Sequence, residues 1–182
     1  MLGFSLITFF MASGCAHTPV KKEFGPWQKS TVGKYLSLQT PGDLKAADVA
    51  LSDELKLKID SIKNYNLDSG DPDNYLCFVN FFTFNSKIIA NLDGAADNVV
   101  NGMQKDPTLS DFKASRQYIQ LGKLKGVRLD GTFNTKGKAG EIHAVVFTYK
   151  NLLWTVAIED LSPTKLTSVT NTILDSVQIN VD

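Results

Sequence analysis

The segment Tyr75–Phe84 constrains the fold more than any other part of the chain. Its sequence, YLCFVNFFTF, is apolar at both odd and even positions and is rich in aromatic and β-branched residues. This composition is typical of a central strand that is covered on both faces. We therefore expect other elements of the chain to pack against each side of it.

Two segments have the helical spacing needed to supply that cover. The first is Asn91–Lys105, and the following Asp106 and Pro107 are expected to end this helix. The second is Ser162–Asp175, where Ser162 is the expected N-cap and Pro163 occupies the first turn. The apolar stripes of the two helices consist of Leu92, Ala95, Ala96, Val99, Val100 and Met103, and of Leu166, Val169, Ile173, Leu174 and Val177. A shorter helix is predicted over Ser52–Asp60, with Ser52 as its N-cap.

A meander of four strands is predicted between the two long helices, over residues 114–121, 126–133, 141–149 and 152–159. The joints are short and rich in turn-forming residues, which favours antiparallel hairpins. Further strands are predicted over 34–38 and 61–67. The order of elements indicates an α+β domain, an α/β/α sandwich with a central twisted antiparallel sheet flanked by helices.

Several of these segments resemble the PsbP and DcrB superfamily. The resemblance lies in YLSLQTP at 35–41, the aromatic strand with its following helix, GVRLDG at 126–131, LWTVAI at 153–158 and ILDSVQI at 173–179. It implies an α/β/α sandwich with a non-enzymatic accessory role, because members serve as binding, assembly or stability factors, several of them as bacterial lipoproteins. It supplies no functional residue, and fold alone does not fix function.

The N-terminus indicates how the chain is anchored. An apolar run from Leu2 to Met11 leads into Ala12, Ser13 and Gly14 and then Cys15, the pattern of a lipobox. The run is too short for a membrane-spanning helix, which needs roughly 20 residues. A cleaved secretory signal beside an ordinary cysteine is the alternative, and no Lys or Arg precedes the run. We interpret residues 1–14 as a lipoprotein signal peptide and Cys15 as the acylated residue, carrying palmitate or a similar chain.

The rest of the chain has room for one domain. Residues 15–33 are predicted to be a lipidated tether punctuated by Pro and Gly, and residues 34–182 a single domain. The expected location is the bacterial envelope. In a Gram-negative host, Ala16 in place of an aspartate favours the periplasmic face of the outer membrane.

The sequence offers little for catalysis, and we predict no enzyme, cofactor or metal. His17 and His143 are the only histidines, and no Gly-x-Ser-x-Gly elbow, phosphate loop or dinucleotide fingerprint is present. His143 is expected to be a solvated or core-edge strand residue, and Cys77 an inert apolar one. Asp68, Asp71 and Asp73 are better explained as a turn than as a calcium loop.

Charge is unevenly distributed along a chain whose formal net charge is zero. Residues 43–112 hold twelve acidic side chains and six lysines, whereas residues 113–140 hold seven basic side chains and Asp130. A solvated surface is one explanation, and an acidic partner or anionic lipid is the other. The predicted interaction surface, with its lysines gathered at one end of the sheet, consists of Lys123, Lys125, Arg128, Lys136 and Lys138.

Two functions follow from these features. The first is a lipid-anchored binding or assembly factor for another envelope protein. The alternative is a carrier of a small apolar ligand, held among Phe78, Phe81, Phe82, Phe84, Phe147 and Trp154. A nucleic-acid partner is not expected, since the chain is exported, neutral and without a recognition motif.

Overall fold

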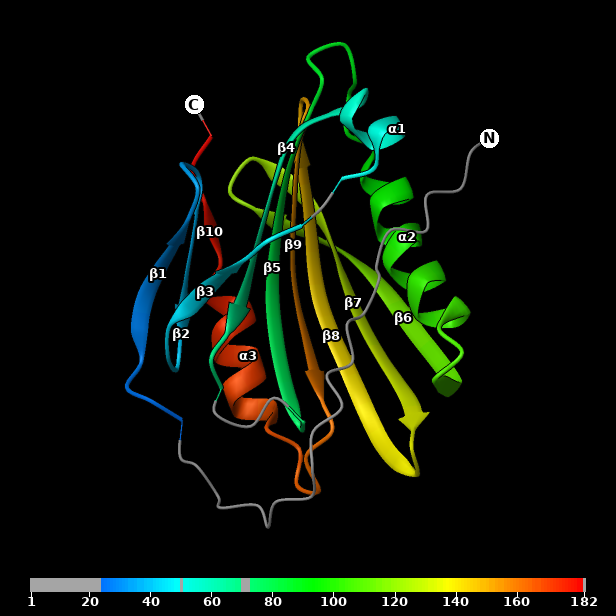
Figure 1. Cartoon of the computed structure of the whole chain (residues 1–182). Coiled ribbons are helices and arrows are strands. Elements are labelled where there is room, and N and C mark those ends of the chain that lie inside the picture. The colour runs from blue at the N-terminus through cyan, green and yellow to red at the C-terminus, as the bar shows by residue number, and fades with distance from the viewer. Residues whose placement is uncertain (1–23, 50, 70–72, 182) are drawn as a thin grey trace.

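Two antiparallel sheets make up most of the structure, a computed structural model that describes residues 24–49, 51–69 and 73–181 (Figure 1). The main sheet has seven strands in the order β3-β4-β5-β9-β8-β7-β6, and the small sheet has three in the order β1-β2-β10. The strands are β1 (Gln28–Val32), β2 (Leu36–Thr40), β3 (Leu44–Ala47), β4 (Ile59–Leu67), β5 (Tyr75–Phe84), β6 (Leu109–Leu121), β7 (Leu124–Thr135), β8 (Lys138–Tyr149), β9 (Leu152–Asp160) and β10 (Gln178–Ile179). The helices are α1 (Asp53–Lys56), α2 (Leu92–Lys105) and α3 (Thr167–Asp175).

The two longer helices lie on opposite sides of the main sheet (Figure 1), and we name its faces after them. On the α3 face, the small sheet and α3 bury a core against β5, β8 and β9. This core includes Leu36, Leu38, Val79, Phe81, Trp154, Val156, Ile158 and Ile173. On the α2 face, the small side chains of Ala96 and Val99 bring α2 close to a smaller core of Val127, Leu129, Ala144, Val146 and Ala157.

The aromatic strand and the meander are confirmed. β5 lies between β4 and β9, and β6 to β9 form consecutive antiparallel pairs. Their turns are tight, with positive φ at Gly122 and at Gly137, where glycine has no steric penalty. The Asn91 side chain caps α2 by accepting a hydrogen bond from the Gly94 amide at 3.1 Å.

Two predicted helices are shorter than expected. The helix predicted over 52–60 ends at Lys56, because Ile59 pairs with Phe84 as the first residue of β4. The helix predicted from Ser162 begins at Thr167 instead. The buried carboxylate of Asp160 accepts hydrogen bonds from the backbone N–H groups of Ser162 and Leu166 at 2.8 and 2.6 Å, which holds the segment between them outside the helix.

The folded domain begins before residue 34, where the predicted tether would end. Gln28–Val32 pairs with β2 as β1, and the ring of Phe24 packs edge-on against Tyr75 with 5.2 Å between centroids. The α/β/α sandwich is matched only in part. The small sheet shares the α3 face with α3, and α2 covers only part of its own face, mainly over β6, β7 and β8.

Candidate functional site

The partial cover of the α2 face leaves an apolar groove over β5 and β9. Side chains of β5 alternate, so Val79 and Phe81 point into the core of the α3 face, whereas Phe78, Phe82 and Phe84 line the groove. The expectation that β5 is covered on both faces therefore holds only in part, because these side chains are only partly buried.

The groove has a floor of strands and walls of helices and loops. Across the floor, Phe78 lies opposite Ala157 and Phe82 opposite Leu153 in the β5–β9 pairing. One wall comes from α2, and the other comes from α1, the start of β4 and the β5–α2 loop. The wall residues are Ala95, Asn98 and Val99, and Leu55, Lys58, Ile59 and Ile88. The enclosed volume is about 240 Å³.

A few polar groups are set among these apolar side chains. Asn80 lies directly opposite Thr155 on the floor, while Asn98 and Lys58 belong to the walls. Lys58 is the one ionisable side chain among the lining residues. An apolar concavity with a few polar groups is suited to hold an apolar chain or side chain and to orient it. The lining contains no pair of groups for acid–base chemistry.

Glu159 lies on the same face, beyond the groove, where it pairs with Leu76 of β5 and Ile142 of β8. Its side chain is buried, and its Oε1 atom has no hydrogen-bond partner among the described residues. Burial, and secondarily the charge of Asp106, raises the pKa of this carboxyl to about 7. Glu159 does not line the groove, so it forms a separate buried feature under the C-terminal end of α2.

A polar network on the α3 face contains His143. The His143 Nδ1 lies 2.7 Å from the Asp130 carboxylate, and its Nε2 lies 3.3 Å from that of Glu141. The Nε atom of Arg128 donates to the same Asp130, and its Nη2 donates to Asn171 of α3 at 3.1 Å. Burial acts to raise the pKa of Asp130, but hydrogen bonds from His143 and Arg128 outweigh it and lower that pKa. The network joins β7 and β8 to α3. These contacts indicate that the half-buried His143 helps to hold the three elements together.

The structure divides the predicted basic surface. Lys123 and Lys125 lie at the β6–β7 turn, and Lys136 and Lys138 at the β7–β8 turn, at the other end of β7. Arg128 is half-buried in the network described above. The expectation that these side chains gather at one end of the sheet is therefore wrong, because β7 is too long to bring its two turns together.

Two of the other residues considered as sites, Cys77 and Asp68, lie in the described part of the chain. Cys77 is buried, and burial raises the pKa of its thiol to about 12, which leaves it without nucleophilic character. Asp68 forms an ion pair with Lys45 at 2.7 Å, while Asp71 and the lipobox with Cys15 lie outside the described residues. Over the described ranges, no three His, Cys, Asp or Glu side chains gather as metal ligands.

Sequence reasoning missed the groove although it named all three rings of its aromatic floor. Of the six rings suggested for a ligand, Phe81, Phe147 and Trp154 are buried in the core of the α3 face. The other three line the groove. The alternation of side chains along β5 could have revealed the groove. The even-numbered rings share one face of the sheet, and how well that face is covered depends on how far α2 extends.

No helix in the described part of the chain combines the length and apolar character needed to cross a bilayer. The chain matches no protein-family model and no curated protein.

Solved structures do resemble it. One is CyanoP, the cyanobacterial PsbP of Synechocystis, at 11% identity and a TM-score of 0.58, over 91% of this chain and 98% of that one. Another is LpqN of Mycobacterium tuberculosis, described as involved in cell envelope biogenesis, at 14% identity and a TM-score of 0.50, over 85% and 92%. At such identities the likeness is one of fold. The chain adopts the PsbP/DcrB-like fold.

Proposed function

We propose that the chain is a lipid-anchored, non-enzymatic protein of the bacterial cell envelope that binds another envelope component in the groove over β5 and β9. The observation that carries this proposal is the groove itself. Its floor exposes three aromatic rings to solvent, those of Phe78, Phe82 and Phe84, and its lining contains no acid–base pair. An envelope role accords with LpqN, a protein of similar fold described as involved in cell envelope biogenesis.

Anchoring is proposed through Cys15, which follows the small residues Ala12, Ser13 and Gly14. Ala16 favours the periplasmic face of the outer membrane in a Gram-negative host. Metabolic labelling with a radioactive fatty acid tests the anchor. Wild-type chain should carry the label and sediment with membranes, whereas a Cys15→Ser chain should carry none. Unlabelled wild-type chain would refute the anchor.

A small apolar ligand is the second candidate for the groove. Its volume of about 240 Å³ and its aromatic floor favour this alternative, although the volume is below the roughly 300 to 1,000 Å³ common for drug-sized ligands. A protein segment that inserts a few apolar side chains needs less space. We therefore place the binding partner first and the carrier second.

One pair of variants tests the groove. Phe82→Asp puts a charge on its floor, and Thr83→Asp puts the same charge on the next residue of β5, whose side chain points to the other face. Chains purified from native membranes should retain the bound component in wild type and Thr83→Asp and lose it in Phe82→Asp. Thermal unfolding confirms that each variant is folded.

The nature of the bound component separates the two candidates. Mass spectrometry of the purified complex identifies a polypeptide if the first candidate is right, and a solvent-extractable amphiphile if the second is right. Equal recovery of the component with Phe82→Asp and Thr83→Asp would remove the groove from the binding site.

A further inference from the structure

Hydrogen bonds between three segments build a rigid platform at one end of the main sheet. The Asn85 amide donates to the carbonyl of Lys58 at 2.8 Å, which joins the β5–α2 loop to the exit of α1. The amides of Phe84 and Ala90 donate to the carbonyls of Asn151 and Lys150 at 2.8 and 2.7 Å, which joins the same loop to the β8–β9 turn. We call this surface the distal platform and define it as Lys56, Leu57, Lys58, Lys87, Ile89 and Lys150.

The distal platform displays the two most exposed large aliphatic side chains among the described residues. Leu57 is 77% and Ile89 is 83% exposed to solvent. Both sit next to residues that line the groove, Lys58 and Ile88. The next residues, Lys58 and Ala90, take part in the hydrogen bonds above, which fixes the backbone beside both side chains. Apolar side chains fixed on a rigid surface beside a groove are typical of an interaction site.

Basic side chains surround these two aliphatic residues. Lys56 forms an ion pair with Asp53 at 2.7 Å, and Lys150 lies 5.0 Å from the centroid of the Tyr149 ring. The nearby carboxylates are Asp53 and Glu54 of α1 and the exposed Asp60 at the start of β4. Other turns at this end of the two sheets add Lys34, Lys123 and Lys125. The end is therefore predominantly basic, and the surface that complements it is acidic with an apolar centre.

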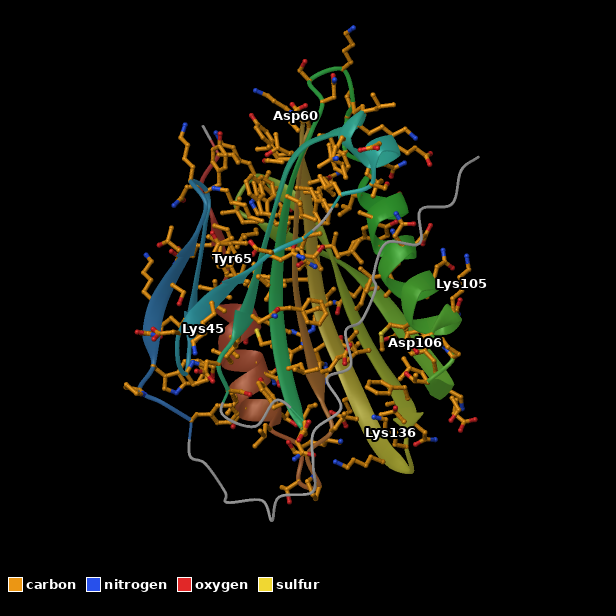
Figure 2. All side chains as sticks on the ribbon, in the orientation of Figure 1. Lys45, Asp60, Tyr65, Lys105, Asp106 and Lys136 are labelled. Atoms are coloured by element: carbon orange, nitrogen blue, oxygen red, sulfur yellow. The ribbon has the colours of Figure 1, made fainter. Side chains whose placement is uncertain are left out.

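The start of the described chain lies at the opposite end of the domain. Phe24 packs on Tyr75, the first residue of β5, which pairs with Asp160 at the last residue of β9. Figure 2 shows the two ends, with Asp60 labelled near the distal platform and Lys136 at the other end. Any chain that connects the domain to Cys15 therefore leaves from the end that carries Lys136.

The reach of that connection fixes which way the platform faces. Nine residue steps separate Cys15 from Phe24, and a fully extended chain spans at most about 32 Å over that distance. β5 starts at Tyr75, beside Phe24, and its ten residues cover about 30 Å along the sheet before the β5–α2 loop that carries Ile89. The platform therefore meets the anchoring bilayer head-on only if the whole connection runs fully extended back along the domain, which is an unfavourable arrangement.

We infer that the distal platform docks an acidic surface of another envelope protein. This inference rests on the proposed anchoring, because the length of the connection to Cys15 favours a protein over the anchoring bilayer. Leu57 and Ile89 enter an apolar depression of the partner, and Lys87 and Lys150 face its carboxylates. The platform adjoins the wall of the groove, so one partner can occupy both.

Site-specific photo-crosslinking in intact cells tests the inference with the full-length chain. A photoreactive residue replaces Ile89 in one chain and, as a matched exposed control, Lys136 in another. The Ile89 chain should form an adduct with a protein, and the Lys136 chain should not. Mass spectrometry should place the crosslink in an acidic segment of that protein.

Charge reversal then tests the chemistry of the contact. In the Ile89 chain, Lys87→Glu with Lys150→Glu should lower the adduct yield about tenfold in membranes at low ionic strength, where exposed charges are least screened. The matched double change Lys136→Glu with Lys138→Glu, at the other end of β7, should leave the yield unchanged. An adduct yield that is unchanged by Lys87→Glu with Lys150→Glu would overturn the inference.

Other outcomes would also overturn it. These are equal adducts from Ile89 and Lys136, an adduct with the mass of two copies of this chain, or an adduct with lipid alone. Binding of the purified chain to vesicles of phosphatidylcholine and phosphatidylglycerol in equal parts, lost in Ile89→Ser, would assign the platform to a lipid surface instead.

The same cells separate this inference from the proposed function. Fatty-acid labelling reports on Cys15, and Phe82→Asp reports on the groove. If labelling fails while the Ile89 adduct persists, the anchor is refuted and the docking surface stands. If labelling succeeds and no adduct forms, the docking surface alone is refuted.

Discussion

The ring of Phe81 on β5 lies nearly parallel to the indole of Trp154 on β9, with 5.5 Å between centroids and 15° between planes. The two residues are also direct partners in the β5–β9 pairing. Tyr35, after β1, meets both rings edge-on. This aromatic contact joins the small sheet to the middle of the main sheet.

Removing either ring should therefore destabilise the whole domain. Phe81→Ala and Trp154→Ala should each lower the free energy of unfolding by about 3 to 5 kcal/mol, because both side chains are buried. Urea denaturation followed by tryptophan fluorescence measures the first, and circular dichroism the second. Phe82→Ala, on the partly exposed face of the same strand, is the control and should cost less. Losses below about 1 kcal/mol for both core variants would contradict this packing.

Glu159 should make the domain less stable as pH rises. Below about pH 4.5, its ordinary pKa, the carboxyl is protonated in both states. Between that value and its folded pKa of about 7, the unfolded chain ionises while the folded one keeps its proton. Because the folded state binds more protons, stability falls as pH rises and has lost about 3 kcal/mol by pH 8.

Urea denaturation at pH 5 and pH 8 checks this dependence. Glu159→Gln keeps the shape of the side chain and removes the titration, so the difference between wild type and variant isolates this carboxyl from other groups. The variant should be more stable than wild type at pH 8 and close to it at pH 5. A constant difference across the range would show that Glu159 does not titrate there.

The carboxylate of Asp160 should be needed to position α3. Asp160→Ala removes the acceptor for the amides of Ser162 and Leu166, and we expect a loss of about 2 kcal/mol. Asp160→Asn keeps one side-chain oxygen and should lose less. Hydrogen exchange at Leu166 should quicken in the alanine variant. Unchanged exchange would mean that the segment before α3 is held by other contacts.

Two glycine substitutions should act in opposite directions. At Gly126, an added Cβ would lie 2.4 Å from the Phe147 ring and 2.9 Å from the Val146 carbonyl oxygen, so Gly126→Ala should cost about 1 to 3 kcal/mol. At Gly94 in α2, the nearest atom would be 3.6 Å away. Gly94→Ala should therefore stabilise the domain by about 0.5 to 1 kcal/mol. Thermal unfolding of both variants measures the contrast, and equal shifts would contradict it.

Long periodic segments were predictable from the sequence, and among the short ones β2 was predicted, over 34–38, whereas β1, β3 and β10 were not. β5, α2 and the four-strand meander follow from apolar spacing and turn residues that act locally. β1, β3 and β10 have five, four and two residues, so their own sequences hold too little pattern. They are strands because β2 and β4 offer them hydrogen bonds.

The candidate site shows the same division. The side-chain parity of β5 is set by the pleat and is visible in the sequence, yet the exposure of Phe82 depends on where α2 ends across the sheet. The prediction that the lysines of two turns gather at one end of the sheet was wrong for a similar reason. Lys123 and Lys136 are thirteen positions apart, but only the full length of β7 shows that they lie at opposite ends.

β6 has a further consequence for the behaviour of the protein at high local concentration. It is a thirteen-residue strand at an edge of the main sheet, while the other edge, β3, has four residues. An open backbone of that length is a template on which a second chain can polymerise. The bulge between Ser110 and Lys113, with Asp111 at φ 54°, and the charge of Lys113 interrupt that template. We therefore expect this edge of the sheet to resist pairing with the same edge of a second copy, even where the protein is crowded.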